Sequence, residues 1–159
     1  MATATSISAF LNAKGVEYSV LEHPLAYTAQ QEAAAAHVSG REWAKTVVYF
    51  ADDEPIMAVL PAHLVVDARR LKELAGASTL RLATERDLAR LYPDCEVGAE
   101  PPLGPLYHQR VFVDRALAED ECVVFDAGTH RDAIKMRYSD YARLTKPIVG
   151  AFGAGAPAQ

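Results

Sequence analysis

Apolar and polar residues alternate along this chain in short runs, and each run is bounded by residues that favour turns or helix caps. Runs of β-branched and aromatic residues predict strands at residues 17–22, 46–51, 56–60, 80–82, 109–114, 122–126 and 133–137. Runs that follow a capping residue predict helices at residues 6–13, 28–40, 67–75, 84–91 and 139–144. Strands and helices are intermixed, and most neighbouring strands are close in sequence. This order predicts an α+β fold with a mixed, largely antiparallel sheet.

The local signals at the ends of these runs are specific enough to test. Thr84 and Asp87 have the spacing of a capping box, and Asp67 and Ser139 are each expected to cap a helix. Residues 52–55 read as the loop of a β-hairpin between two apolar runs.

Length and charge limit the classes of protein that need to be considered. The chain has 159 residues, which favours one domain over residues 1–150, and the small residues of 151–159 predict a flexible tail. The formal net charge of −5 argues against a polycation that coats nucleic acid, although a local basic patch could still bind the end of an RNA.

The cysteines and the apolar runs indicate in which cellular compartment the protein acts. Cys95 and Cys122 form no disulfide framework and have no metal-ligand spacing, which suits a reducing cytoplasm. The first residues do not have the pattern of a signal peptide. The longest apolar run, residues 56–66, is too short to span a bilayer. We therefore expect a cytoplasmic protein.

One cation and one stiff turn carry the candidate chemistry. Lys45 lies where a strand begins, and a half-buried ammonium can stabilise the negative charge that develops when water attacks an ester. Further along, Gly98 lets the backbone approach a ligand closely, and Pro102 keeps the turn rigid up to Gly104. Each feature also has a structural explanation, namely a lysine that guards a sheet edge and a plain proline-rich turn.

No set of residues in the sequence predicts a covalent nucleophile. There is no Gly-x-Ser-x-Gly motif, and neither cysteine lies in a cysteine-hydrolase context, so both are expected to be structural. His130, in the turn of a predicted hairpin, could orient a water molecule or contact a substrate amine, or it could simply face solvent.

The order of these motifs resembles the YbaK/EbsC family of aminoacyl-tRNA editing domains over roughly residues 10–144. The resemblance rests on these segments: Glu22-His23-Pro24, residues 28–36 followed by His37-Val38-Ser39-Gly40, Ala44-Lys45-Thr46, Gly98-x-x-x-Pro102 with Gly104, Ala127-Gly128-Thr129-His130, and Ser139-x-x-Tyr141. It implies a curved mixed sheet, partly barrel-like and flanked by helices.

The resemblance also implies an activity and a site. Members hydrolyse the ester between a wrong amino acid and the terminal ribose of a tRNA, and they use no metal or other cofactor. By position, Lys45, Gly98 and His130 are the expected catalytic residues. The expected substrate-binding residues are Pro102, Gly104, Gly128, Thr129, Thr46 and His23. The expected substrate is a small amino acid (alanine, cysteine or serine) on tRNA for proline.

The resemblance also implies binding partners, and the sequence leaves other functions open. We expect contact with the CCA end of an aminoacyl-tRNA, with prolyl-tRNA synthetase or an elongation factor as candidate protein partners, and no contact with DNA or membrane. Arg69, Arg70 and Lys72 could contact phosphates, although a solvated helix face also explains them. Two other functions remain open: a non-catalytic module that binds a small ligand or a tRNA end, and a cysteine-dependent hydrolase or redox protein.

Overall fold

The computed structural model describes residues 5–24, 31 and 42–155. In chain order its elements are α1 (Thr5–Ala13), β1 (Tyr18–Glu22), β2 (Ala44–Ala51), β3 (Glu54–Pro61), β4 (Leu64–Val66), α3 (Ala68–Ala75), β5 (Leu80–Leu82), α4 (Glu85–Leu91), the 3₁₀ helix η1 (Gly104–Tyr107), β6 (Arg110–Asp114), α5 (Arg115–Ala118), β7 (Cys122–Asp126), β8 (Asp132–Arg137), α6 (Tyr138–Thr145), β9 (Ile148–Gly150) and β10 (Gly153–Gly155). The predicted helix at residues 28–40 lies outside the described residues except for Gln31.

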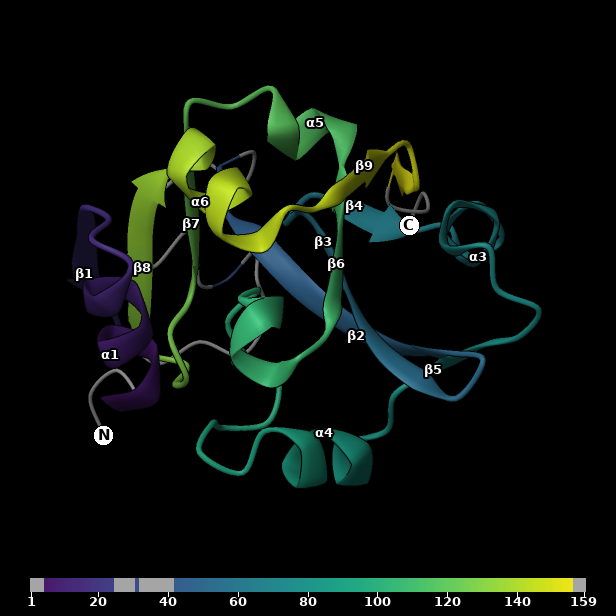
Figure 1. Cartoon of the computed structure of the whole chain (residues 1–159), viewed down its shortest axis with the longest axis horizontal. Helices are drawn as coiled ribbons and strands as arrows, with labels where there is room; N and C mark the ends of the chain where they lie inside the picture. The colour runs from purple at the N-terminus through teal and green to yellow at the C-terminus, as the bar shows by residue number, and fades with distance from the viewer. Residues whose placement is uncertain (1–4, 25–30, 32–41, 156–159) are drawn as a thin grey trace.

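The described strands form open sheets, and no closed barrel is present among them. A five-stranded sheet has the order β5-β2-β3-β6-β9, a three-stranded sheet has the order β1-β8-β7, and β10 pairs with β4. The pairs β3–β6 and β6–β9 are parallel and all other pairs are antiparallel. Figure 1 shows the three-stranded sheet on the left and the five-stranded sheet in the middle and right of the molecule. The predicted α+β class with a mixed sheet is confirmed.

The β2–β3 hairpin is tighter than predicted. Its turn consists of Asp52 and Asp53, which have φ values of 49° and 70°, and Ala51 pairs directly with Glu54. Two consecutive positive φ values are typical of the two-residue turn that matches the twist of a β-hairpin. The Asp52 carboxylate accepts hydrogen bonds from the backbone N–H groups of residues 78 and 79, which holds this turn against the start of β5.

Most of the capping predictions agree with the structure. Asp67 caps α3, and Thr84 and Asp87 form a reciprocal capping box at α4. The prediction for Ser139 is wrong, because α6 begins at Tyr138 with Arg137 as its N-cap residue and without a side-chain cap. The strand β8 runs directly into α6, so the chain leaves no separate position for a capping serine.

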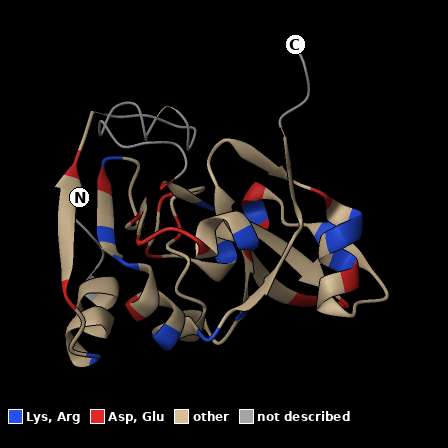
Figure 2. Ribbon diagram, turned by 90° about the horizontal axis from the view of Figure 1, so that it is seen from above, with Lys and Arg blue, Asp and Glu red and all other residues tan. Residues whose placement is uncertain are grey.

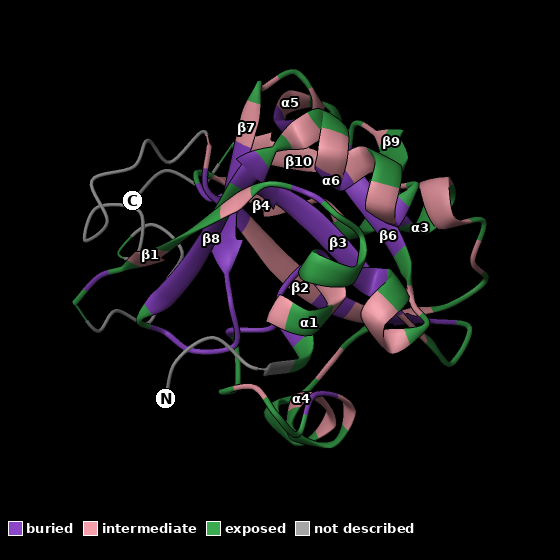
Figure 3. Cartoon of the chain, turned by 60° about the vertical axis from the view of Figure 1, so that its left-hand side comes forward, coloured by how far each residue is buried: buried purple, intermediate pink, exposed green. Residues whose placement is uncertain are grey.

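The hydrophobic core is divided between the two faces of the five-stranded sheet. Alternate residues of a strand point to opposite faces. Ala44 and Val48 of β2 therefore join the larger cluster, whereas Ala51 joins a second cluster beneath α3. Buried residues concentrate on β3, β7 and β8, and α4 is mostly exposed (Figure 3).

Within the expected tail, residues 151–155 contact the rest of the fold, and Gly153–Gly155 form β10. The Phe152 side chain is fully buried, and β10 pairs with β4. The Asp114 carboxylate accepts hydrogen bonds from the backbone N–H groups of Phe152 and Gly153 at 3.1 and 2.7 Å. An aromatic side chain among glycines and alanines is enough to anchor this short segment, because its burial removes a large apolar surface from water.

Among the described residues, no helix has both the length and the apolar character that a membrane-spanning helix needs.

Candidate active site

Lys45 lies at the start of β2, as predicted, with its side chain half-buried. Burial lowers the pKa of Lys45 below its usual value, because removal of water disfavours the charged ammonium. An anionic or strongly polar ligand beside this ammonium would replace part of the lost hydration. The next residue, Thr46, is also half-buried, but its side chain points to the opposite face of the strand.

The start of β2 is also where the two larger sheets meet. Trp43 forms an isolated parallel bridge with Val124 of β7, and the Val124 N–H donates to the carbonyl oxygen of Glu42 at 3.0 Å. Trp43 and Val124 pack in the same small apolar cluster, so they share a face of the joined sheets. Two residues further along its own strand in each case, Lys45 and Asp126 point to the same face of their strands as Trp43 and Val124 do. A lysine and a buried aspartate therefore line the junction between the two sheets.

The predicted glycine-proline turn adjoins the same end of β7. Gly98 has a φ of 89°, a conformation that glycine adopts without strain. The turn is tied to the loop after β7, because Gly128 donates its N–H to Ala99 (3.0 Å) and accepts from the N–H of Glu96 (2.8 Å). The structure thus brings together the turn and the 128–130 loop, which are distant in the sequence.

His130 strengthens the link between these two loops. Its Nε2 atom lies 2.8 Å from the carbonyl oxygen of Val97, and since a carbonyl can only accept, Nε2 carries the proton. Its backbone N–H donates to a carboxylate oxygen of Glu96 at 2.7 Å. His130 as a whole is 6% exposed, so it is not a solvated turn residue. These contacts make it a positioning residue for the Gly98 turn.

Other predicted substrate-binding residues have structural contacts that explain their presence. The Pro102 carbonyl accepts a hydrogen bond from the Tyr141 hydroxyl at 2.8 Å. A Cβ on Gly104 would overlap the backbone of Gln109, so only glycine fits there. The Thr129 hydroxyl donates to the Asp132 carboxylate at 2.7 Å and closes its own turn.

His23 lies at the end of β1 next to this turn. Its backbone N–H donates to the carbonyl oxygen of Arg131 at 2.9 Å, and its ring packs edge-on against Trp43 with centroids 5.7 Å apart. His23 therefore borders the same sheet junction as Lys45, through Trp43.

Glu100 is the residue that the sequence analysis missed. It lies inside the turn between Ala99 and Pro101, and only 3% of it is exposed. Burial, with a smaller contribution from the nearby Asp126, raises the pKa of Glu100 to about 7. Its neighbours in the sequence are glycine, alanine and proline, which indicate a turn. Burial itself could not be read from that pattern.

The environment of Cys95 is not that of a nucleophile. Burial raises the pKa of the Cys95 thiol to about 12, and its sulfur lies 3.5 Å from the Tyr107 hydroxyl. Since the thiolate is the reactive form, this environment makes Cys95 inert at neutral pH. Among the described residues, no cluster of histidine, cysteine and carboxylate side chains has an arrangement that could hold a metal ion.

The expected phosphate contacts are exposed on α3. Arg69, Arg70 and Lys72 lie at one end of the molecule, on the right in Figure 2, and Arg70 forms an ion pair with Asp67 at 3.6 Å. An exposed pair of this kind contributes little to stability and leaves the helix face available.

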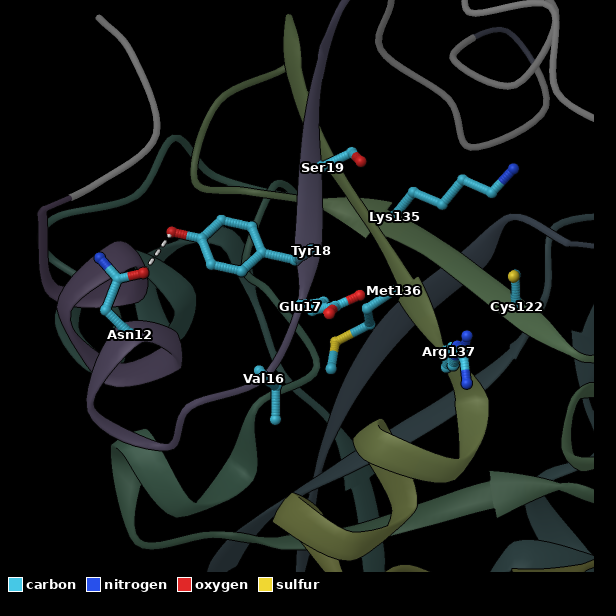
Figure 4. A pocket seen from close by; sticks show the side chains of 9 residues that line it. All are labelled: Asn12, Val16, Glu17, Tyr18, Ser19, Cys122, Lys135, Met136 and Arg137. Carbon is cyan, nitrogen blue, oxygen red and sulfur yellow. Dashed lines mark hydrogen bonds between the residues drawn. The ribbon is translucent and has the colours of Figure 1, made fainter.

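An open groove of about 720 Å³ lies elsewhere, where β8 ends and β1 begins (Figure 4). Tyr18, Lys135 and Arg137 line it, and the Tyr18 hydroxyl donates to the Asn12 side chain at 3.0 Å. The turn with His130 precedes β8, whereas Arg137 ends it, so this groove is separate from the candidate site.

The fold and the paired loops define an α+β domain with a charged sheet junction, and comparison with known proteins identifies its family. The model of the aminoacyl-tRNA editing domain matches residues 23–144. The chain belongs to this family.

Similar sequences include prolyl-tRNA synthetases. Proline–tRNA ligase of Nitratidesulfovibrio vulgaris strain DP4 is 31% identical over 132 residues, which cover 77% of this chain and 23% of the ligase. The ligase of Streptococcus thermophilus strain LMD-9 is 27% identical over 148 residues, which cover 87% of this chain and 24% of the ligase. The chain thus spans about a quarter of the length of these relatives.

Solved structures share the fold. Hypothetical protein APE2540 has a TM-score of 0.84 at 22% identity, over 94% of this chain and 99% of its own. A "putative trans-editing enzyme for prolyl tRNA synthetase" has a TM-score of 0.83 at 22% identity, over 96% of this chain and 97% of its own.

Proposed function

We propose that this protein is an aminoacyl-tRNA deacylase that acts in trans, in the cytoplasm, on a small amino acid wrongly attached to tRNA for proline. Membership of the editing-domain family and similarity to prolyl-tRNA synthetases support the proposal. The observation that carries it is the half-buried Lys45, which lies at the sheet junction on the same face as Asp126.

The proposed reaction is hydrolysis assisted by charge and position. Lys45 stabilises the oxyanion that forms when the oxygen of a water molecule adds to the ester carbonyl carbon. The bond from that carbon to the ribose oxygen then breaks, and the departing ribose oxygen takes up a proton. The rigid turn from Gly98 to Pro102 positions the CCA end, so no covalent intermediate with the protein is required.

The amino acid is expected to be alanine first, with cysteine and serine as further candidates. A pocket discriminates single methylene groups only modestly, so a site for alanine also admits side chains of similar size. The proposed source of tRNA selectivity is the acceptor stem or a protein partner, either prolyl-tRNA synthetase or an elongation factor.

Release of amino acid from a panel of mischarged tRNAs tests the activity. The parent should deacylate alanyl-tRNA for proline, and Lys45→Ala should lower kcat/KM by about 10²–10³-fold, the usual cost of losing one oxyanion-stabilising group. Lys14→Ala, at an exposed position after α1, is the control and should retain the parental rate. If Lys45→Ala deacylates as fast as the parent, the site assignment is wrong. Binding without hydrolysis in the parent would favour the non-catalytic module.

The ribose 2′-hydroxyl is proposed to help activate the attacking water. A substrate that ends in 2′-deoxyadenosine should then lose most of its turnover, measured by release of amino acid under single-turnover conditions. Undiminished turnover would exclude this role.

A further inference from the structure

The carboxyl group of Glu100 is buried with one oxygen unused. Backbone N–H groups of Glu100 and Gly98 lie against this carboxylate. Its Oε2 atom is fully buried and has no hydrogen-bond partner among the described residues. A buried carboxylate oxygen without a donor is costly, so its persistence in the turn that is hydrogen-bonded to the 128–130 loop indicates that a ligand supplies the missing donor.

The charges around Glu100 favour a cation as that donor. Asp126, which is 9% exposed, acts on Glu100 as a like charge, and His130 is the nearby group that acts in the opposite direction. Two adjacent carboxylates repel each other in a site of low polarity, and a positively charged ligand relieves that repulsion.

On the proposed function, the substrate has one such cation. The α-amino group of an aminoacyl ester is an ammonium separated from the ester carbonyl by a single carbon atom. We propose that Glu100 and Asp126 form the binding site for the α-ammonium group of the aminoacyl substrate. Lys45 lies across the sheet junction from Asp126, so the ammonium end and the developing oxyanion face groups of opposite charge.

This arrangement predicts selectivity for a free α-amine. An ester in which an uncharged hydroxyl or acylated amine replaces the ammonium would leave the Oε2 atom of Glu100 without a charged donor. The protein should therefore discriminate against such substrates even when their side chain is a methyl group, as in alanine.

The decisive experiment compares alanyl-tRNA with lactyl-tRNA, which differs only in an α-hydroxyl in place of the amine. The parent should hydrolyse alanyl-tRNA at least tenfold more efficiently in kcat/KM. Glu100→Gln keeps the shape of the side chain and removes its charge, and it should reduce that ratio to near one by lowering the rate on alanyl-tRNA. Glu119→Gln, the same change at an exposed position, should leave the ratio as in the parent.

Two results would overturn the inference. If Glu100→Gln lowers the rates on both substrates equally, Glu100 acts on the water or on the fold and not on the amine. If it lowers neither, the carboxyl has no part in recognition. Both results leave the deacylase activity of the parent intact, so they separate this inference from the proposed function.

A binding measurement covers the case in which the parent hydrolyses neither ester. The probes are 3′-alanylamino-3′-deoxyadenosine, which cannot be hydrolysed as an ester, and its propionylamino counterpart without the amine. Calorimetry should show tighter binding of the amine-bearing probe to the parent and equal binding of both probes to Glu100→Gln. That result in a parent without activity would refute the proposed function and support the ammonium site, whereas equal binding of both probes to the parent would refute the site.

Discussion

At the scale of single residues, the backbone of Gly98 has the most specific requirement. Its φ of 89° lies in the region that residues with a Cβ rarely adopt. The cost of placing an L-residue there is about 1–2 kcal/mol. A Cβ at this position would contact the His130 ring at 3.5 Å, an ordinary van der Waals distance, so the backbone and not a clash sets the cost. Gly98→Ala should therefore lower the free energy of unfolding by about 1–2 kcal/mol, measured by urea denaturation.

Gly155→Ala is the matched control for this prediction. Gly155 has no positive φ, and a Cβ there would meet no atom within 4 Å. Its replacement should change the free energy of unfolding by no more than about 0.5 kcal/mol. Equal effects of the two substitutions would contradict the assignment of strain to Gly98.

Single residues also mark the limit of what could be predicted from the sequence. Lys45 was placed correctly at a strand start because the β-branched run after it is easy to recognise. Glu100 was not predicted to be buried, since a carboxylate beside prolines normally indicates a solvated turn. The contacts of His130 depend on the approach of residues 96–99, which no local pattern encodes.

At the scale of elements, one hydroxyl joins α6 to the glycine-proline turn. The Tyr141 side chain is fully buried, and its hydroxyl is the donor to the Pro102 carbonyl. Tyr141→Phe would leave that carbonyl buried without this donor, at a cost of about 1–3 kcal/mol. We expect a loss of this size in the free energy of unfolding, together with weaker deacylation because the turn is less firmly held.

Tyr138→Phe provides the comparison on the same helix. The Tyr138 hydroxyl is buried without a hydrogen-bond partner among the described residues, so its removal breaks no described bond. Its effect on stability should be neutral or favourable. A loss as large as that of Tyr141→Phe would show that the Pro102 contact is not the source of the effect.

The elements that sequence patterns missed include three strands of three residues each, β4, β9 and β10. β5 is equally short but was predicted, because its residues alternate between apolar and polar, whereas those of the other three do not. Their pairing depends on partners far along the chain, such as β6 for β9 and β4 for β10. The longer strands and the capped helices α3 and α4 were predicted because their signals are local.

At the scale of the whole molecule, Glu100 links stability to pH. The pKa of its carboxyl is about 7 in the folded protein and close to 4.5 in the unfolded chain. Between pH 4.5 and about pH 7, Glu100 is protonated in the folded protein and ionised in the unfolded chain. The free energy of unfolding therefore falls as the pH rises through this range. Above pH 7 the full cost remains, up to about 3 kcal/mol for a shift of this size.

Glu100→Gln removes the ionisation and should therefore stabilise the protein at alkaline pH. Its free energy of unfolding should exceed that of the parent by up to about 3 kcal/mol at pH 8 and by little at pH 5, measured by urea denaturation at both values. The free energy of unfolding of Glu119→Gln should differ from that of the parent by the same small amount at both pH values. A gain for Glu100→Gln that does not depend on pH would show that the buried charge is not its cause.

The pairing of Trp43 with Val124 has a consequence for motion. Among the described residues, this is the position where the backbones of the two larger sheets are bridged, and the Val124 amide makes the hydrogen bond. If the sheets part transiently, that amide should exchange with deuterium faster than amides within either sheet. A substrate bound between Lys45 and Asp126 would hold the two sheets together. Slower deuterium exchange of the Val124 amide when substrate binds would be evidence for this.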